Sequence, residues 1–116
     1  MSTKNLELKS VEYRKKILEI IFNGGAGHTA GSLSCIDILN VLYNKILDIN
    51  PSNFSSYDRN YYIQSKGHSV EALYTVLCDR NFFPKEDLLY WVDEKGSHSP
   101  RSWSHQAKDI LLWMYK

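Results

Sequence analysis

Apolar residues recur with the spacing of an amphipathic α-helix along most of this chain, and only one short stretch has the pattern of a β-strand. The helical pattern predicts helices over residues 6–22, 33–47 and 70–80, and a shorter one within 81–91. The strand pattern covers residues 61–65, which are aromatic, β-branched or polar. One strand cannot form a sheet by itself. The 116 residues therefore predict a mostly helical, domain-sized unit that is part of something larger.

The first predicted helix carries an apolar stripe that we expect to face the core. The charged run YRKK would lie on its solvent-exposed side. Residues at helical spacing form the stripe: Leu8, Val11, Leu18 and Phe22, widened by Tyr13, Ile17 and Ile20. The sequence Asn-Gly-Gly at residues 23–25 predicts the end of this helix, since asparagine and glycine tolerate the left-handed backbone of a C-terminal cap. In the second helix, Ser34 and Asp37 predict an N-terminal capping box.

The composition is that of a soluble globular protein, with 43% hydrophobic and 23% charged residues. The formal net charge is +1 with both signs interspersed, which gives no reason to expect nucleic acid as a partner. No segment has the apolar length of a membrane span or the pattern of a signal peptide. Cys35 and Cys78 lie inside apolar helical patterns and are expected to be buried, reduced thiols. We therefore expect a cytoplasmic protein that binds neither nucleic acid nor a membrane.

A Gly-His pair stands just before two of the predicted helices, with His28 in the first pair and His68 in the second. The N-terminus of a helix attracts anions, because its backbone N–H groups are unpaired and the helix dipole is positive there. Glycine lets a ligand approach the backbone, and histidine offers an N–H donor and passes a proton near neutral pH. Two such turns that converge in space would suit a diphosphate or a phosphorylated substrate.

These turns could also have a purely structural role, without binding any ligand. A single histidine near the start of a helix is more often a cap or a surface residue than a catalytic group, and the glycines can serve a tight turn alone. A zinc site is not expected. No two of the four histidines have the short sequence spacing of a zinc-ligand pair, and no closely spaced pair of cysteines accompanies them. We therefore assign no metal ligand in the sequence.

Three segments together resemble the N-terminal part of transketolase, a thiamine-diphosphate enzyme: GAGHTAGSLSCIDILNVLY, DRNYYIQSKGHSVEALY and FFPKEDL. Their order and spacing match the family as well as their residues do. The resemblance covers about residues 11–96. It implies an α/β parent fold, the thiamine-diphosphate-binding domain, in which residues 61–65 are one strand of a parallel sheet. This chain would contribute a mostly α-helical part of that fold with about one short β-strand.

The resemblance also implies roles for three residues. His28 would lie beside the sugar substrate, as a substrate-binding and catalytic residue that assists proton movement. His68 would contact the cofactor near its diphosphate, and Gly31 would lie close to the cofactor with only its backbone to offer. The cofactors would be thiamine diphosphate and Mg²⁺. The reaction would transfer two-carbon ketol units between sugar phosphates, as in the pentose phosphate pathway.

The chain also departs from the family. It contains no Gly-Asp-Gly, the sequence with which the family holds its metal and the diphosphate, and from about residue 99 it no longer resembles the family. We therefore expect residues 1–98 to be the N-terminal part of a transketolase-like diphosphate-binding domain, and residues 99–116 to be a divergent tail with a possible short helix. A complementary transketolase polypeptide or a homodimer is the expected partner, and the isolated chain is expected to be inactive. The alternative is a non-catalytic helical interaction module derived from the transketolase fold.

Overall fold

The computed structural model describes residues 1–25 and 27–90 of the chain. In order, the elements are α1 (Thr3–Gly24), α2 (Thr29–Val41), the π-helical turn η1 (Leu42–Ile46), the 3₁₀ turn η2 (Gly67–Ser69), α3 (Val70–Asp79) and α4 (Lys85–Tyr90). The predicted boundary at residue 98 and the predicted tail helix within 99–116 lie outside the described residues. The three longer predicted helices and the short fourth one are all present.

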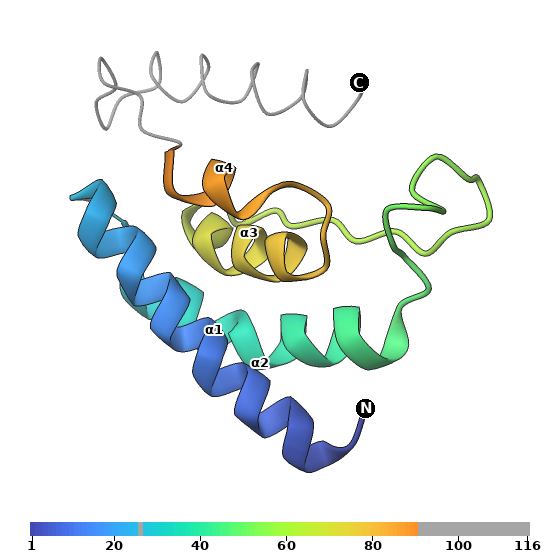
Figure 1. Cartoon of the computed structure of the whole chain (residues 1–116), viewed down its shortest axis with the longest axis horizontal. Helices are drawn as coiled ribbons and strands as arrows, with labels where there is room; N and C mark the ends of the chain where they lie inside the picture. The colour runs from blue at the N-terminus through green and yellow to red at the C-terminus, as the bar shows by residue number, and fades with distance from the viewer. Residues whose placement is uncertain (26, 91–116) are drawn as a thin grey trace.

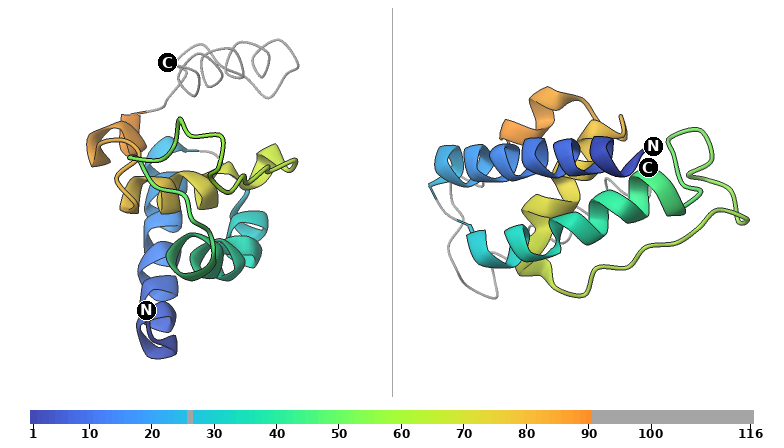
Figure 2. Two further views of the ribbon diagram at one scale, coloured as in Figure 1. Left: turned by 90° about the vertical axis from the view of Figure 1, so that its right-hand side faces the viewer. Right: turned by 90° about the horizontal axis from the view of Figure 1, so that it is seen from below.

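Helices α1, α2 and α3 each pack against the other two, and α4 lies on the side of α3 opposite α2 (Figure 1). In the view from below, α3 lies across the space between α1 and α2 (Figure 2). The ends of α1 are set by local chemistry. The hydroxyl of Ser2 accepts a hydrogen bond from the N–H of Asn5 at 3.2 Å, and Gly25 ends the helix in the left-handed region at φ 67°. The predicted glycine cap is therefore confirmed.

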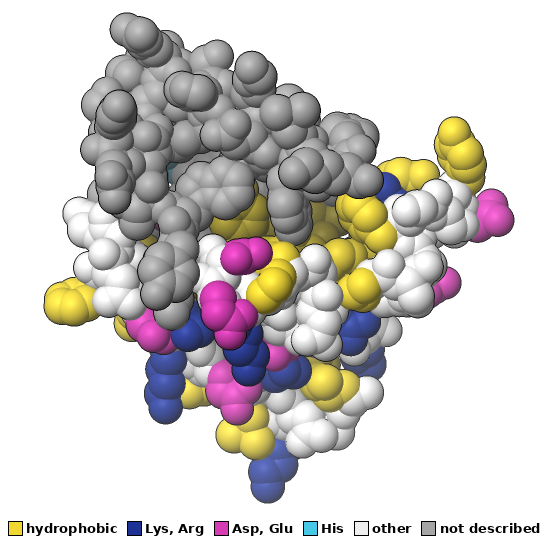
Figure 3. Space-filling view, turned by 45° about the horizontal axis from the view of Figure 1, so that its top comes forward, with side chains coloured by type: hydrophobic (Ala, Val, Ile, Leu, Met, Phe, Trp, Pro, Cys, Tyr) yellow, Lys and Arg dark blue, Asp and Glu magenta, His cyan; other side chains and the backbone are white. Residues whose placement is uncertain are grey.

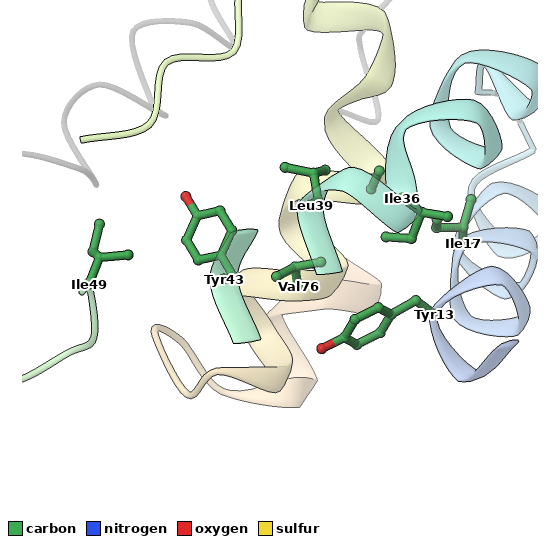
Figure 4. Packing of buried hydrophobic residues seen from close by; sticks show 8 residues of the cluster. Tyr13, Ile17, Ile36, Leu39, Tyr43, Ile49 and Val76 are labelled. Carbon is green, nitrogen blue, oxygen red and sulfur yellow. The ribbon is translucent and has the colours of Figure 1, made fainter. Parts of the chain in front are cut away.

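The core lies where these three helices meet. Side chains from each of them point toward one another there (Figure 4). The buried hydrophobic cluster consists of Tyr13, Ile17, Ile36, Leu39, Tyr43, Ile49, Ala72 and Val76. Ile17, Ile36 and Val76, one from each helix, are all 0% exposed. Burial of this apolar surface holds α2 and α3 together, and the two Gly-His pairs lie at the starts of these helices.

The hydrophobic pattern predicted the buried face of α1 only in part, because Tyr13 and Ile17, which widened the predicted stripe, are buried and the four residues at its centre are not. The buried residues are Leu6, Ser10, Tyr13 and Ile17, whereas Leu8, Val11, Leu18 and Phe22 are between 48% and 86% exposed. The reason is a polar contact with α2. The amide of Asn40, which is 1% exposed, donates to the carbonyl of Leu6 at 2.7 Å and to the hydroxyl of Ser10 at 2.8 Å. These bonds satisfy buried polar groups, so they select a face that hydrophobicity alone does not indicate.

The prediction of a β-strand at residues 61–65 was wrong for the chain by itself. These residues form an extended trace that leads from the 50–60 loop to the start of α3 (Figure 1), and no strand occurs within residues 1–25 and 27–90. A strand needs a neighbouring strand to receive its backbone hydrogen bonds. The described part is therefore helical, and it does not contain the sheet of an α/β domain.

The described part of the surface carries charges of both signs, as the composition suggests. On the face in Figure 3, positive and negative side chains lie next to one another on the described part of the surface. None of the helices in residues 1–25 and 27–90 is long and apolar enough to cross a membrane. Both cysteines are free thiols, with Cys78 buried and Cys35 half-buried.

Candidate functional site

The structure brings the two Gly-His turns together. The imidazole rings of His28 and His68 lie edge to face, with 4.3 Å between their centroids and an interplanar angle of 75°. His28 is the N-cap residue of α2, and His68 lies in η2, directly before α3. Both side chains are exposed. The convergence that the sequence suggested is therefore present, and it places two imidazoles where a ligand can reach them.

Helix α2 starts earlier than the sequence predicted. It begins at Thr29 rather than at residue 33, and Ser34 lies inside it, where its hydroxyl donates to the carbonyl of Gly31 at 2.9 Å. The predicted capping box is therefore wrong. Its acid, Asp37, instead pairs with Arg14 of α1 at 2.5 Å. The backbone of His28 takes the N-cap position, which fixes this histidine at the very start of the helix.

Because α2 starts earlier, Gly31 lies in its first turn and faces the start of α3. A Cβ added at Gly31 would lie 2.9 Å from the hydroxyl oxygen of Ser69 and 3.5 Å from the ammonium nitrogen of Lys66. A distance below 3.0 Å is too short for real Cβ contacts, so a larger residue would require the buried Ser69 side chain or one of the helix starts to shift. Ser69 is 3% exposed, and its hydroxyl has no hydrogen-bond partner within the described residues. Glycine at position 31 thus permits the close approach that brings the two histidines together.

A hydrogen bond between α2 and α3 supports the same arrangement. The hydroxyl of Ser32, which is fully buried, donates to Oε2 of Glu71 at 2.9 Å. The other carboxylate oxygen of Glu71 lies 2.9 Å from the position that a Cβ on Gly27 would occupy. Glu71 therefore lies under the turn that carries His28. Ser32, Glu71 and Lys66 were not predicted from the sequence. The acidic residue in the first turn of α3 was a signal for Glu71, whereas nothing local marked Ser32.

The donor groups at this site suit an anion. The positive ends of α2 and α3 meet there, and two imidazoles and the Lys66 ammonium lie between them. Lys66 forms no ion pair in the part of the chain that the structure describes. These residues therefore fit the anionic end of a phosphorylated ligand. They do not fit a metal ion, because no group of three or more histidine, cysteine or acidic side chains with the geometry of a metal site occurs in residues 1–25 and 27–90.

The two helix starts, with both imidazoles and Lys66, form a candidate anion-binding site. Residues 9–86 match the family described as "Transketolase, thiamine diphosphate binding domain". The match covers most of the chain, including both Gly-His turns, and the chain belongs to this family.

Several curated proteins are similar to the chain. It is 40% identical over 86 residues to an apulose-4-phosphate transketolase subunit of Phocaeicola vulgatus, and the match covers 74% of this chain and 31% of that protein. It is 39% identical over 87 residues to the 6-deoxy-6-sulfo-D-fructose transketolase subunit SqwG of a Clostridium species, with 75% and 31% covered. It is 33% identical over 72 residues to "Transketolase 2" of Escherichia coli, with 61% and 11% covered. The chain thus spans about a third of the length of the first two of these relatives.

Proposed function

We propose that this chain is the N-terminal piece of a transketolase-like enzyme that depends on thiamine diphosphate. The enzyme would transfer two-carbon ketol units between sugar phosphates, as in the pentose phosphate pathway of the cytoplasm. The observation that carries the proposal is the contact between the rings of His28 and His68, whose centroids are 4.3 Å apart, in a chain of the thiamine diphosphate binding family. Residues 1–98 would be the N-terminal part of the diphosphate-binding domain.

In this proposal the start of α3 holds the cofactor. A neutral imidazole donates a charge-assisted hydrogen bond to a phosphate oxygen, so His68 binds the diphosphate. Gly31 offers its backbone and no side chain, which leaves room for the cofactor beside the start of α2. Lys66 adds a positive charge within the same site, next to Gly31. Bound thiamine diphosphate supplies the carbon centre that accepts and releases the ketol unit.

In this proposal, His28 binds the sugar substrate and acts on it. Its position at the very start of α2, in contact with His68, supports this role, because a ligand that binds His68 would lie beside it. Its ring donates a hydrogen bond to a sugar hydroxyl or carbonyl oxygen, and it moves a proton to or from that oxygen during transfer. Glu71 and Ser32 act on this step only by holding the two helix starts together.

The remaining walls of the site belong to a complementary polypeptide. The described residues offer no cluster of metal ligands, so the Mg²⁺ that accompanies the cofactor would be bound by groups elsewhere in the assembly. Two of the similar proteins are themselves named as transketolase subunits, which favours an enzyme of several chains here too. Transfer requires groups fixed on both sides of the reacting carbon, so the isolated chain is expected to be inactive.

A reconstitution experiment tests the proposal. The chain is mixed with the part of the Phocaeicola vulgatus relative that it does not match, together with the other subunits of that enzyme. Ketol transfer between sugar phosphates is then measured with thiamine diphosphate and Mg²⁺. We expect transfer in the mixture and none with the chain alone. Turnover by the chain alone, or a mixture that needs no thiamine diphosphate, would refute the proposal.

Two variants separate the roles of the histidines in that mixture. His68→Ala is expected to weaken thiamine diphosphate binding about tenfold or more, since it removes a hydrogen bond to a charged group. His28→Gln is expected to lower kcat by about a hundredfold or more, with cofactor affinity unchanged. Tyr57→Ala is the control, because this side chain is 94% exposed in the 50–60 loop. A cofactor affinity that is equal in wild type and His68→Ala would remove His68 from the cofactor site.

A further inference from the structure

The start of α3 contains a buried hydroxyl group whose hydrogen-bonding capacity the fold does not use. Ser69 is 3% exposed, and its hydroxyl oxygen has no hydrogen-bond partner within residues 1–25 and 27–90. Most buried polar side chains in native proteins have a partner, because an unpaired group loses the hydrogen bonds that it would make with water. The packing of the helices alone therefore does not explain this hydroxyl.

Helix capping is the usual role of a serine at this position, and Ser69 does not perform it. Ser69 is the N-cap residue of α3, where a serine side chain normally accepts a hydrogen bond from a backbone N–H in the first turn. Its side chain makes no such bond. At the start of α1, by contrast, the hydroxyl of Ser2 accepts from the N–H of Asn5 at 3.2 Å. The hydroxyl of Ser69 is thus not explained as a cap.

This hydroxyl instead faces the first turn of α2. The start of α2 and η2 lie side by side (Figure 2). The atom nearest to the Cβ position of Gly31 is the hydroxyl oxygen of Ser69, at 2.9 Å, and the ammonium nitrogen of Lys66 is 3.5 Å from the same position. Lys66 is an exposed side chain. The end of an exposed, flexible lysine therefore lies beside the buried hydroxyl, on the same side of Gly31.

Both helix starts also contribute backbone donors. The N–H groups of Thr29, Ala30 and Gly31 are in the first turn of α2, where they have no partner inside the helix. Neither α2 nor α3 has a side-chain cap hydrogen bond at its start. Uncapped N–H groups, an ammonium and a hydroxyl are all able to donate, and the positive ends of two helix dipoles add to their effect. This set of donors matches an oxygen atom that carries negative charge.

We propose that Ser69 and Lys66 form a subsite for a phosphoryl oxygen beside the first turn of α2. On binding, the ammonium of Lys66 turns outward to the anion, and the hydroxyl of Ser69 donates a hydrogen bond to one of its oxygens. This inference rests on the proposed function, because the diphosphate of the cofactor would supply that oxygen. It adds Ser69 to the residues that position the diphosphate. A side chain at Gly31 would lie against the hydroxyl and block this approach.

A hydroxyl that is kept for a ligand differs from a structural one in its effect on stability. In the free chain it makes no hydrogen bond, so Ser69→Ala is expected to leave the urea midpoint of unfolding unchanged or to raise it. Thr75 on the same helix gives the contrast. It is 2% exposed, and its hydroxyl donates to the backbone carbonyl of Glu71 at 2.7 Å. Thr75→Val removes a hydrogen bond that exists in the free chain, so it is expected to lower the urea midpoint.

The test is a titration of the 116-residue chain with inorganic pyrophosphate at constant ionic strength, followed by NMR of the backbone amides. In the wild type, we expect the amides of residues 29–31 and 69–71 to shift. Ser69→Ala is expected to weaken binding about tenfold, and Thr75→Val is expected to bind as the wild type does. Equal affinities of the wild type and Ser69→Ala overturn the proposal, as does an absence of shifts at the helix starts. A Ser69→Ala variant that loses affinity and stability together has lost a structural group, which also overturns it.

Lys66→Met tests the second group of the subsite, because it removes the charge and keeps the apolar stem of the side chain. It is expected to weaken pyrophosphate binding about tenfold and to reduce the dependence of binding on salt concentration. Lys45→Met is the matched control, since Lys45 is an exposed lysine in η1, beyond the other end of α2. Equal effects of the two variants would show that only net charge matters and would overturn the assignment of Lys66.

The reconstituted mixture separates this inference from the proposed function. A loss of thiamine diphosphate affinity in His68→Ala, but none in Ser69→Ala, would overturn the subsite and leave the proposed function standing. A mixture that needs no thiamine diphosphate, together with the loss of pyrophosphate affinity in Ser69→Ala, would refute the proposed function and support the subsite. A sugar phosphate that binds the chain more tightly than pyrophosphate does, and depends on Ser69, would assign the oxygen to the substrate and overturn its assignment to the cofactor.

Discussion

Two single variants at adjacent residues of α1, compared with each other, test the orientation of this helix. The packing of the whole domain depends on that orientation. Ile17 is 0% exposed, and Leu18 next to it is 48% exposed. Ile17→Ala removes roughly three buried carbon groups at about 0.8 kcal/mol each, or about 2.4 kcal/mol. The cavity that remains adds to this loss, so we expect the free energy of unfolding to fall by about 2–5 kcal/mol. Leu18→Ala should cost about 0.5 kcal/mol or less, because it leaves no cavity and alanine is a good helix former.

The measurement is equilibrium unfolding in urea, followed by far-UV circular dichroism. Both variants should unfold with the same dependence on urea concentration as the wild type, so that differences in midpoint report differences in stability. The stripe predicted from the sequence places Leu18 at the centre of the buried face and Ile17 only at its margin. Equal losses for the two variants, or a larger loss for Leu18→Ala, would therefore refute the orientation of α1 described above.

Three other changes have defined outcomes. Burial alone would raise the pKa of the Asp79 carboxyl, but hydrogen bonds from Lys9 and Tyr13 hold that pKa below its ordinary value. Its contribution to stability is present above the unfolded pKa of about 3.9 and is lost as the pH falls through the lower folded value. Asp79→Asn should thus destabilise the chain at neutral pH and flatten the acid side of its stability profile, and an unchanged slope in acid would contradict this. Asn40→Ala should cost about 1–3 kcal/mol in urea unfolding, because Asn40 is 1% exposed and its amide bonds join α2 to α1. A loss below about 0.5 kcal/mol would show that these bonds do not fix the face of α1. Gly31→Ala should shift the imidazole resonances of both histidines in NMR spectra, and Ser69→Ala in the same chain should restore them, since it removes the oxygen 2.9 Å from the added Cβ. Unshifted resonances in the single variant would show that the helix starts tolerate a side chain there.

The site was partly visible in the sequence because its chemistry is local. A glycine and a histidine before an amphipathic helix can be recognised without any tertiary contact, and the motifs around His28 and His68 occur in an order that identified the family. The contact between the two rings follows from the packing of α2 on α3. Ser32 and Glu71 were missed because their hydrogen bond joins residues that are 39 positions apart, and the first-turn position of Glu71, the one local signal, does not indicate Ser32 as its partner.

The sequence by itself determined the helices and their approximate bounds, because helical periodicity and capping depend on residues within a few positions of one another. Only the tertiary structure decided which side of α1 is buried. Both sides of this helix are partly apolar, and the choice depends on polar bonds to Asn40, which is distant in sequence. The tertiary structure also decided the state of residues 61–65. Their composition is that of a strand, but a strand exists only where a neighbour accepts its backbone hydrogen bonds, and the described residues provide none.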